Sequence, residues 1–390
     1  MDTSRDYRKA YADLVAYCSK AQHIVIFGHR GPDGDSVGST MALKLLLEAW
    51  GKRVDVIMSG SLPQNLSWLS GVHSILRQSR QEEEIQSILS SCDLMICLDF
   101  NALHRLGSGL RDLVVLQRSQ REFPLLMIDH HPDPSDEFDW QWSCPEAAAT
   151  CEVLTRLFLD ADERWIDIAD HTVDSGTSPL EGQALVQRRS AIATALLVGI
   201  ITDTGLFNHN ASSPELYELV AVLLRSGADK ERAVNRIFHA HPESRQRMEG
   251  YILYERVVVL PEIQSAYFVL TKADFERFNL AIADTDGFVN MPLDINGVNC
   301  SAFFRETPDD GVKISVRSIG NIAVNDLCQE CFGGGGHKNA AGGEFSEGSI
   351  GDAVDRFVDY MQRHYAIDTR KKQTSPRGGG IPIPKELLEL

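Results

Sequence analysis

Short apolar runs alternate with helical patterns along the first half of the chain. Four such runs cover residues 23–29, 54–58, 93–99 and 124–129. Between the first two, residues 36–50 place apolar side chains at helical spacing, and Gly51 ends the pattern. Continuous apolar strands joined by helices are typical of a parallel sheet that is covered on both faces. We therefore expect an N-terminal α/β domain of this kind.

The predicted strands repeatedly end in aspartate or histidine. His29, Asp99 and the triplet 129–131 (Asp-His-His) follow apolar runs, and Asp203 follows the helical pattern over 190–202. In open parallel α/β sheets, ligands bind outside the carboxyl ends of the strands. These side chains are therefore expected to converge on one edge of the sheet.

The segment 28–36 adds two more carboxylates, Asp33 and Asp35, and a helix N-cap, Ser36. Each acidic residue alone is compatible with a turn or a cap. Together, five aspartates and three histidines at one edge would repel strongly if left unpaired, and such a set suits Mn²⁺, Zn²⁺ or Fe²⁺. Two ions about 3.5–4 Å apart commonly serve phosphoric ester hydrolysis, where they activate a water for in-line attack on phosphorus and neutralise the phosphoryl oxygens.

A glycine-rich segment over 333–343 is the second strong feature. A run of glycines lets backbone N–H groups turn toward one point and bind an anion, and His337 and Lys338 lie within it. The segment matches neither a Walker loop nor a dinucleotide fingerprint, and a flexible loop is the alternative interpretation. Upstream, Arg305 and Arg317 end β-like segments, and arginine binds phosphate in a bidentate manner, although each alone is compatible with a surface residue.

The residue pattern divides the rest of the chain into segments and becomes β-like from about residue 263. Residues 145–159 are helical in pattern, with Pro145 in the first turn. Residues 171–189 are rich in Ser, Gly, Thr and Pro and are expected to form a loop or insertion. Residues 213–259 are helical in pattern, with a first helix that begins at Ser213-Pro214 and ends at Ser226-Gly227, and β-like segments begin near residue 263. The expected organisation is a metal-binding α/β domain over 1–210, a helical linker over 211–259, a smaller α+β domain over 260–368 and a disordered tail over 369–390.

The net charge of the chain limits the kinds of partner that it can bind. Lys+Arg number 38 against 55 Asp+Glu, a net charge of −17. This balance argues against binding long nucleic acids or an anionic membrane surface, but a local site can still take a short anion.

The localisation expected is cytoplasmic. The first twenty residues carry charges and no apolar core, and the apolar run over 191–201 is short of the ~20 residues that span a bilayer. Eight cysteines are then expected to be reduced thiols, and Cys328 and Cys331 lack the second pair of a zinc site, which favours two cysteines on a helix.

The joint motif set resembles the DHH phosphoesterase superfamily, over residues 20–345. The motifs on which this resemblance rests are His29-x-x-Pro32-Asp33-x-Asp35-x-x-Gly38-Ser39, Asp99 with the trailing Arg105-Leu106-Gly107, Asp129-His130-His131, and Thr202-Asp203-Thr204-Gly205. In the second half, Ser315-x-Arg317-Ser318 and the glycine-rich segment with His337 and Ala340-Ala341-Gly342 resemble the DHH-associated C-terminal substrate domain.

The resemblance implies roles for these residues. One metal would be held by His29, Asp33 and Asp99, and the other by Asp35, Asp99, His130 and Asp203, so that Asp99 bridges the two. Asp129 would orient a histidine, and His131 would lie beside the scissile phosphate as its ligand or as proton donor to the leaving oxygen. The residues expected to contact the distal nucleotide or its phosphate, across a cleft, are Arg305, Arg317, Gly335, Gly336, His337 and Asn339. The family usually uses manganese, with Mg²⁺ or Co²⁺ as alternatives, and the resemblance suggests a homodimer.

The single-arm, two-domain arrangement resembles members that degrade very short oligoribonucleotides, 3′-phosphoadenosine 5′-phosphate or the linear dinucleotide from cyclic di-AMP. The expected function is therefore a manganese-dependent phosphodiesterase or phosphatase on such short substrates. An exopolyphosphatase or pyrophosphatase is the first alternative, although the pyrophosphatase branch has a different C-terminal domain. A non-catalytic nucleotide sensor is the second, and the complete ligand set argues against it. The sequence leaves open the preferred substrate, the metal, the oligomeric state and the roles of residues 171–189 and the basic tail.

Overall fold

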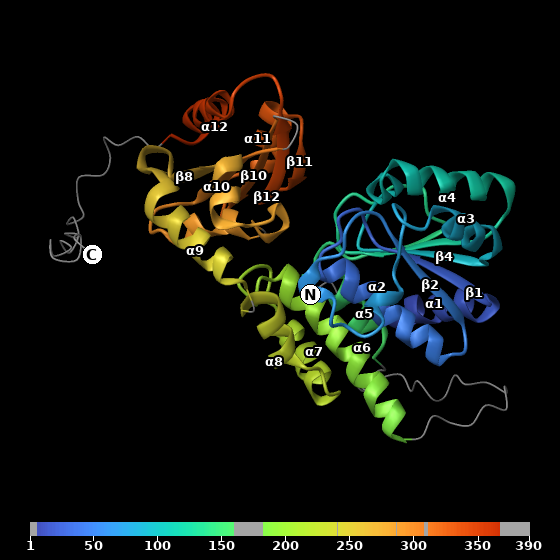
Figure 1. Cartoon of the computed structure of the whole chain (residues 1–390). Helices are drawn as coiled ribbons and strands as arrows, with labels where there is room; N and C mark the ends of the chain where they lie inside the picture. Colours follow the sequence, from blue (N-terminus) through green and yellow to red (C-terminus); the bar gives the residue numbers. More distant parts are fainter. Residues whose placement is uncertain (1–5, 160–181, 240, 286, 308–310, 367–390) are drawn as a thin grey trace. The chain divides into compact units, whose positions relative to one another are not determined.

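The structure is a computed structural model, and it describes residues 6–159, 182–239, 241–285, 287–307 and 311–366. It divides into two compact units, Met1–Ala240 and His241–Leu390, which are described separately (Figure 1). The division falls inside the segment 211–259 that was expected to be a helical linker. Residues 171–181 of the expected loop and the tail 369–390 lie outside the described residues.

The first unit is built on a six-stranded sheet in the order β3-β2-β1-β4-β5-β6, and every adjacent pair is parallel. The strands are β1 (His23–Phe27), β2 (Arg53–Met58), β3 (Leu76–Arg77), β4 (Leu94–Leu98), β5 (Leu125–Asp129) and β6 (Trp140–Ser143). The chain runs outward from β1 to β3 and then returns to β4 on the other side of β1. This order reverses the direction of winding between β1 and β4, so the crevice at their carboxyl ends is the expected ligand position.

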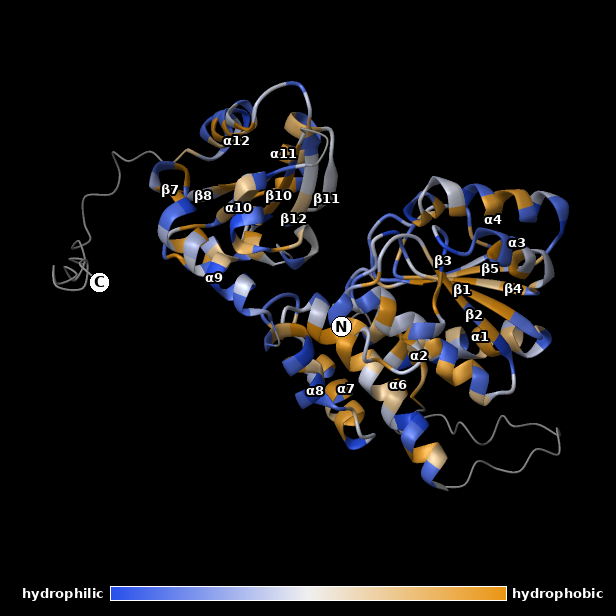
Figure 2. Ribbon diagram, viewed as in Figure 1, coloured by the Kyte–Doolittle hydropathy of each residue, from blue (hydrophilic) through white to orange (hydrophobic). Residues whose placement is uncertain are grey.

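Helices cover both faces of this sheet, as the apolar strands predicted. Every residue of β1, β4 and β5 is buried, and alternate residues enter two separate cores. Figure 2 shows these strands largely in the hydrophobic colour. One core packs against α1 (Tyr7–Lys20), α2 (Gly34–Ala49), α5 (Thr150–Leu157) and α6 (Gly182–Asp203). The other packs against α3 (Glu82–Ser91) and α4 (Ser108–Gln120).

The helices α2 and α6 pack at very short range because glycines lie at their crossing. A Cβ on Gly38 would lie 2.4 Å from the carbonyl oxygen of Ala195 and 3.2 Å from the backbone nitrogen of Gly199. Only a residue without a side chain permits this approach. The contact brings the start of α2 beside the end of α6, so Asp35 lies close to Asp203.

Two helices of the first unit differ from the sequence expectation. Helix α6 begins at Gly182, so residues 182–189 are helical rather than part of a loop. Its stretch 183–203 is long and apolar enough to cross a membrane by length and composition, yet Ile192, Leu196 and Ile200 are buried in the core, as in a core helix of a soluble protein. Helix α5 was expected over 145–159 but begins only at Thr150, because the N–H groups of its first turn bind a side chain from elsewhere in the chain.

The remaining α-helices among the described residues of the first unit are α7 (Pro214–Arg225) and α8 (Lys230–Val234), which pack on α6. The predicted start at Ser213-Pro214 and stop at Ser226-Gly227 of α7 are confirmed.

The second unit has a mixed six-stranded sheet in the order β11-β12-β10-β9-β8-β7, in which only β8 and β9 are parallel. The strands are β7 (Val258–Leu260), β8 (Ser265–Leu270), β9 (Cys300–Glu306), β10 (Val312–Ser318), β11 (Gly335–His337) and β12 (Ala340–Phe345). One face packs on α11 (Val324–Phe332) and α12 (Ile350–Tyr365). Part of the other packs on α9 (Glu243–Tyr251), the 3-10 segment Phe288–Asp294 and the apolar side of α10 (Lys272–Phe278).

The glycine-rich segment is an ordered hairpin rather than a loop. Strands β11 and β12 pair antiparallel, and Gly335 lies opposite Gly342. A Cβ on Gly334 would lie 2.0 Å from the carbonyl oxygen of Gly342, and one on Gly343 would lie 2.5 Å from the Cβ of Phe332. Part of the glycine content therefore serves close packing of the hairpin against α11. Cys328 and Cys331 both lie on α11, as expected.

Candidate metal centre

The loops after β1 and β4 carry the first two site residues. His29 and Asp99 follow neighbouring strands at the point where the winding of the sheet reverses, and Asp99 adopts a left-handed backbone conformation (φ +67°). The backbone N–H of Arg30 donates to the carbonyl of Arg105 at 2.7 Å, which joins the two loops. A strained, non-glycine conformation at a strand end is common at functional sites.

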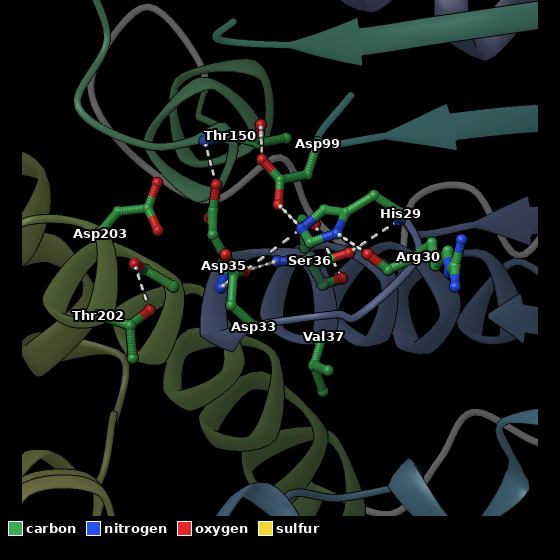
Figure 3. A network of polar contacts seen from close by, with 12 residues as sticks. His29, Arg30, Asp33, Asp35, Ser36, Val37, Asp99, Thr150, Thr202 and Asp203 are labelled. Atoms are coloured by element: carbon green, nitrogen blue, oxygen red, sulfur yellow. Dashed lines mark hydrogen bonds and ion pairs between the residues drawn. The ribbon is translucent and has the colours of Figure 1, made fainter. Parts of the chain in front are cut away.

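The start of α2 supplies two carboxylates with different surroundings. Asp33 is the N-cap of α2, and its Oδ1 accepts from the N–H groups of Asp35 and Ser36, at 3.1 Å each. Asp35 lies in the first turn and is fully buried. Its Oδ2 accepts from the N–H of Thr150 at 2.6 Å and its Oδ1 from that of Cys151 at 2.9 Å. Local capping therefore positions one carboxylate, and a distant helix positions the other (Figure 3).

A first group of possible metal ligands contains His29, Asp33 and Asp99. The Nε2 atom of His29 lies 3.7 Å from Oδ1 of Asp33 and 3.4 Å from Oδ2 of Asp99. The Nδ1 atom of the same ring is 3.1 Å from the carbonyl oxygen of Arg30. A proton on Nδ1 leaves the lone pair of Nε2 directed at the carboxylates, which is the tautomer that ligates a metal.

A second group contains Asp35, His130 and Asp203. The Nε2 atom of His130 lies 3.3 Å from Oδ2 of Asp203 and 4.0 Å from Oδ2 of Asp35. Its Nδ1 is 3.3 Å from the carbonyl oxygen of Ala147. This ring is therefore held in the same way as that of His29.

Asp99 connects the two groups. Its Oδ2 faces His29, whereas its Oδ1 lies 3.7 Å from Nε2 of His130. Ligands that share one ion about 2.1 Å away are separated by roughly 3.0–3.4 Å. The spacings in both groups approach this range, and the carboxylate and imidazole donors suit a divalent transition metal.

The electrostatics of the site also fit a cation. Burial and the neighbouring Asp35 raise the pKa of Asp99 well above its usual range. Burial and Asp35 likewise raise the pKa of Asp203 to about 7. Although burial opposes it, bonding to Asp33 and Asp99 raises the pKa of His29 to about 11. Positive charge is therefore stabilised here, as expected of a site that binds cations.

Asp129 and His131 form a pair beside these groups. Asp129 is fully buried, and its Oδ1 accepts from Nδ1 of His131 at 2.8 Å. Its Oδ2 has no hydrogen-bond partner among the described residues. The rings of His131 and His130 meet edge to face with centroids 4.8 Å apart. This hydrogen bond orients the ring of His131 next to the ligand groups.

Sequence reasoning missed the residues that hold the carboxylates. Thr150 donates to Asp35 through its backbone and to Oδ1 of Asp99 through its hydroxyl, at 3.2 Å. Ser36, which the sequence suggested as the N-cap, lies inside α2 because Asp33 is the N-cap, and its hydroxyl accepts from the N–H of His29 at 3.2 Å. The sequence around Thr150 carries no motif for this role, so only the packing of α5 against α2 reveals it.

The second unit brings several predicted substrate contacts to one sheet face. On β10, Ile314 and Val316 enter the core under α11 and α12, so Arg317 lies on the other face of the sheet. Arg305 on the neighbouring strand β9 pairs with Lys313 and lies on that same face. Burial lowers the pKa of the Arg305 guanidinium, an effect that the charge of Glu344 opposes. Arg317 pairs with Ala340 on β12, and Gly335 pairs with Gly342, which is two residues further along the same strand.

The other three residues predicted to contact the substrate lie in different surroundings. The side-chain amide of Asn339 donates to Oγ of Ser318 at 2.8 Å and to the carbonyl of Ile322 at 3.3 Å, so it holds the turn after β10. Gly336 has φ +146°, a conformation that favours glycine. The backbone of His337 pairs with Ala340, and its side chain lies outside the described structure.

The first unit is a parallel α/β unit with a cluster of histidines and aspartates where the winding of the sheet reverses. The second is a mixed-sheet unit with arginines on one face. Together they define a phosphoric ester hydrolase of two units. Residues 23–200 match the DHH family N-terminal domain, and residues 266–363 match the DHHA1 domain. The chain belongs to the DHH family of phosphoesterases.

Known proteins similar to this chain share both units. The bifunctional oligoribonuclease and PAP phosphatase NrnA of Thermus thermophilus is 27% identical, over 90% of this chain and 93% of its own length. The probable enzyme of the same name from Streptococcus mutans is 24% identical, over 85% of this chain and 93% of its own. The crystal structure of an exopolyphosphatase-related protein from Bacteroides fragilis is 32% identical, with a TM-score of 0.82, over 94% of this chain and 98% of its own.

Proposed function

We propose that this chain is a two-metal phosphodiesterase or phosphatase that hydrolyses short oligoribonucleotides, linear dinucleotides such as pApA, or 3′-phosphoadenosine 5′-phosphate. Residues 1–210 would carry catalysis and residues 260–368 would bind the substrate. The observation that carries the proposal is the position of Asp99, whose two oxygens face two separate groups of ligands.

His29, Asp33 and Asp99 would hold one ion, and Asp35, Asp99, His130 and Asp203 the other. Manganese is the proposed metal, with Mg²⁺ or Co²⁺ as alternatives. Bound divalent ions supply charge neutralisation at the phosphoryl oxygens and lower the pKa of an attacking water.

The protein's own side chains contribute the rest. His131 donates from Nδ1 to Asp129, so its Nε2 is the atom available to a phosphoryl or leaving oxygen. We propose that this ring binds the scissile phosphate or protonates the leaving oxygen, and that Asp129 holds its tautomer. Arg305 and Arg317 would bind a terminal phosphate on the face of the second sheet, together with Gly335, Gly336, His337 and Asn339.

The names of the relatives support the short substrates: the enzyme from Thermus thermophilus is named as a bifunctional oligoribonuclease and PAP phosphatase. The net charge of −17 favours short anions over long nucleic acids. A cytoplasmic homodimer remains part of the proposal.

The test is a substrate panel with purified full-length protein and Mn²⁺, with products identified by mass spectrometry. The panel contains pApA, RNA of two to five nucleotides, 3′-phosphoadenosine 5′-phosphate and a long RNA. We expect mononucleotide release from the short substrates and little from the long RNA. Asp35→Ala and His130→Ala should lose turnover by about 10³-fold or more. Full activity in either variant would contradict the site, and no turnover of any nucleotide would contradict the substrate class.

A polyphosphate or pyrophosphate hydrolase is a second candidate, because the similar protein from Bacteroides fragilis is named as exopolyphosphatase-related. Pyrophosphate and long polyphosphate are therefore included in the panel. A higher kcat/KM on either than on pApA would favour this candidate.

A further inference from the structure

A single helical turn contacts carboxylates of both proposed ligand groups. Thr150 is the first residue of α5, and its N–H donates to Oδ2 of Asp35 at 2.6 Å. The next N–H, that of Cys151, donates to Oδ1 of Asp35 at 2.9 Å. The hydroxyl of Thr150 donates to Oδ1 of Asp99 at 3.2 Å.

The contact to Asp35 replaces a local helix cap. The residue before α5 is Ala149, which has no side chain that can accept from the first turn. The first N–H groups of a helix need acceptors, and a buried helix start without them is costly. Asp35, 115 residues earlier, provides both acceptors, so both of its oxygens are oriented by α5.

The contact to Asp99 depends on the side chain at position 150. Thr150 is fully buried, and Asp99 is only 2% exposed, so water cannot replace the hydroxyl without a change in packing. The oxygen that receives this hydrogen bond is also the one that faces His130. Rotation of the Asp99 carboxylate would turn both oxygens away from the two ligand groups.

We propose that Thr150 is a positioning residue that holds the Asp99 carboxylate across the two metal sites and thereby sets their affinity. This proposal rests on the proposed metal centre. Groups that hydrogen-bond to metal ligands commonly change metal affinity or activity by about 10–100-fold when removed.

Thr150→Val tests the hydroxyl, because valine keeps the shape of threonine and removes the donor. A second pair, Thr150→Ser and Thr150→Ala, lacks the methyl group in both members and differs only in the hydroxyl, so it serves if the valine variant does not fold. Thr155→Val is the matched control: Thr155 is also fully buried on α5, but its hydroxyl donates to the carbonyl of Cys151 at 2.7 Å.

The measurement is Mn²⁺ binding to metal-free, full-length protein, by the electron paramagnetic resonance signal of free Mn²⁺, with a melting curve of each metal-free variant. We expect Thr150→Val and Thr150→Ala to bind Mn²⁺ about tenfold more weakly or worse. Thr150→Ser should bind close to wild type, and Thr155→Val should lose stability but keep its affinity.

Wild-type affinity in Thr150→Val or Thr150→Ala would overturn the role of Thr150 while leaving the metal centre intact. Equal weakening in Thr155→Val would overturn it as well, because packing would then be the cause. A wild-type protein that binds no Mn²⁺ would overturn the metal centre and this role together.

Discussion

Oδ1 of Asp129 accepts a hydrogen bond from Nδ1 of His131, two residues further along the chain, at 2.8 Å. Asp129 is the last residue of β5 and is fully buried, whereas His131 lies in the loop beyond it. The pair resembles the general arrangement in which a buried carboxylate fixes the tautomer of a catalytic histidine.

Asp129 and His131 should therefore act as one unit in catalysis. We expect His131→Ala to lower kcat by about 10²-fold or more, and Asp129→Asn to lower it by about tenfold or more. Because residues that act as a unit are non-additive, the double variant should be no worse than His131→Ala. Steady-state kinetics on pApA measure kcat for the two single variants and the double variant. A loss of kcat in the double variant equal to the product of the two single losses would contradict the coupling.

Gly199 on α6 should not tolerate a side chain. A Cβ at this position would lie 2.5 Å from Oδ1 of Asp35 and 2.3 Å from Sγ of Cys151. Gly199→Ala should displace Asp35, abolish activity and cost about 1–3 kcal/mol of stability.

Gly250→Ala is the control for this change, because Gly250 is also helical and a Cβ there has no atom within 4 Å. That variant should be neutral or slightly more stable. Urea unfolding and turnover of pApA check both proteins, and an active Gly199→Ala protein would show that α2 and α6 can separate without harm to Asp35.

Asp274 should make the stability of the second unit dependent on pH in the acid range. Its carboxylate closes the capping box of α10 with Thr271 and pairs with Arg256 at 2.8 Å. Although burial opposes it, these hydrogen bonds and those from Tyr251 lower the pKa of Asp274. A lowered folded-state pKa means that the stabilisation is complete above the unfolded pKa of about 3.9 and is lost as the pH falls through the folded value.

Asp274→Asn should therefore cost about 1–2 kcal/mol at pH 7, and its difference from wild type should shrink below about pH 4. Urea unfolding at a series of pH values tests this. Glu276→Gln, an exposed change on the same helix, should behave as wild type throughout. A difference that stays constant down to low pH would contradict the role of the Asp274 charge.

Arg305 should affect substrate binding more than chemistry. It lies on the face of the second sheet opposite α11 and α12, on the strand next to that of Arg317. We expect Arg305→Ala to raise KM for pApA about tenfold with a smaller change in kcat, because it removes a charge-assisted contact to phosphate. Arg363→Ala, on α12 and exposed, is the control with the same loss of charge. A fall in kcat at unchanged KM would contradict a role in binding.

Asn339 is expected to behave differently from Arg305. Because its amide already holds the turn through Ser318 and Ile322, Asn339→Ala should lower the stability of the second unit by about 1 kcal/mol or more. Comparison of its melting temperature with its KM separates the two effects. A raised KM at unchanged stability would support the direct nucleotide contact that the sequence suggested.

Local patterns in the sequence were sufficient for much of the fold. The apolar runs that became β1, β4 and β5 and the periodic stretches of α2 and α7 specify their own conformation, because burial periodicity and caps are local properties. The aspartates and histidines at strand ends also pointed to one edge of a parallel sheet, since that edge collects all strand ends.

Other elements depended on contacts that no local pattern encodes. The start of α5 at Thr150 depends on acceptors from Asp35, and the hairpin β11–β12 depends on pairing between glycines that taken alone favour a loop. The order β3-β2-β1-β4-β5-β6, which makes His29 and Asp99 neighbours, also follows from packing rather than from position in the chain.

The sequence by itself therefore determined which residue types could bind metal and on which edge of the sheet they would lie. Only the tertiary structure decided how they are oriented: which oxygen of Asp99 faces His29 and which faces His130, and that Thr150 donates to it. The physical reason is that residue identity specifies donors and acceptors, whereas their direction is set by helices and strands packed from distant parts of the chain.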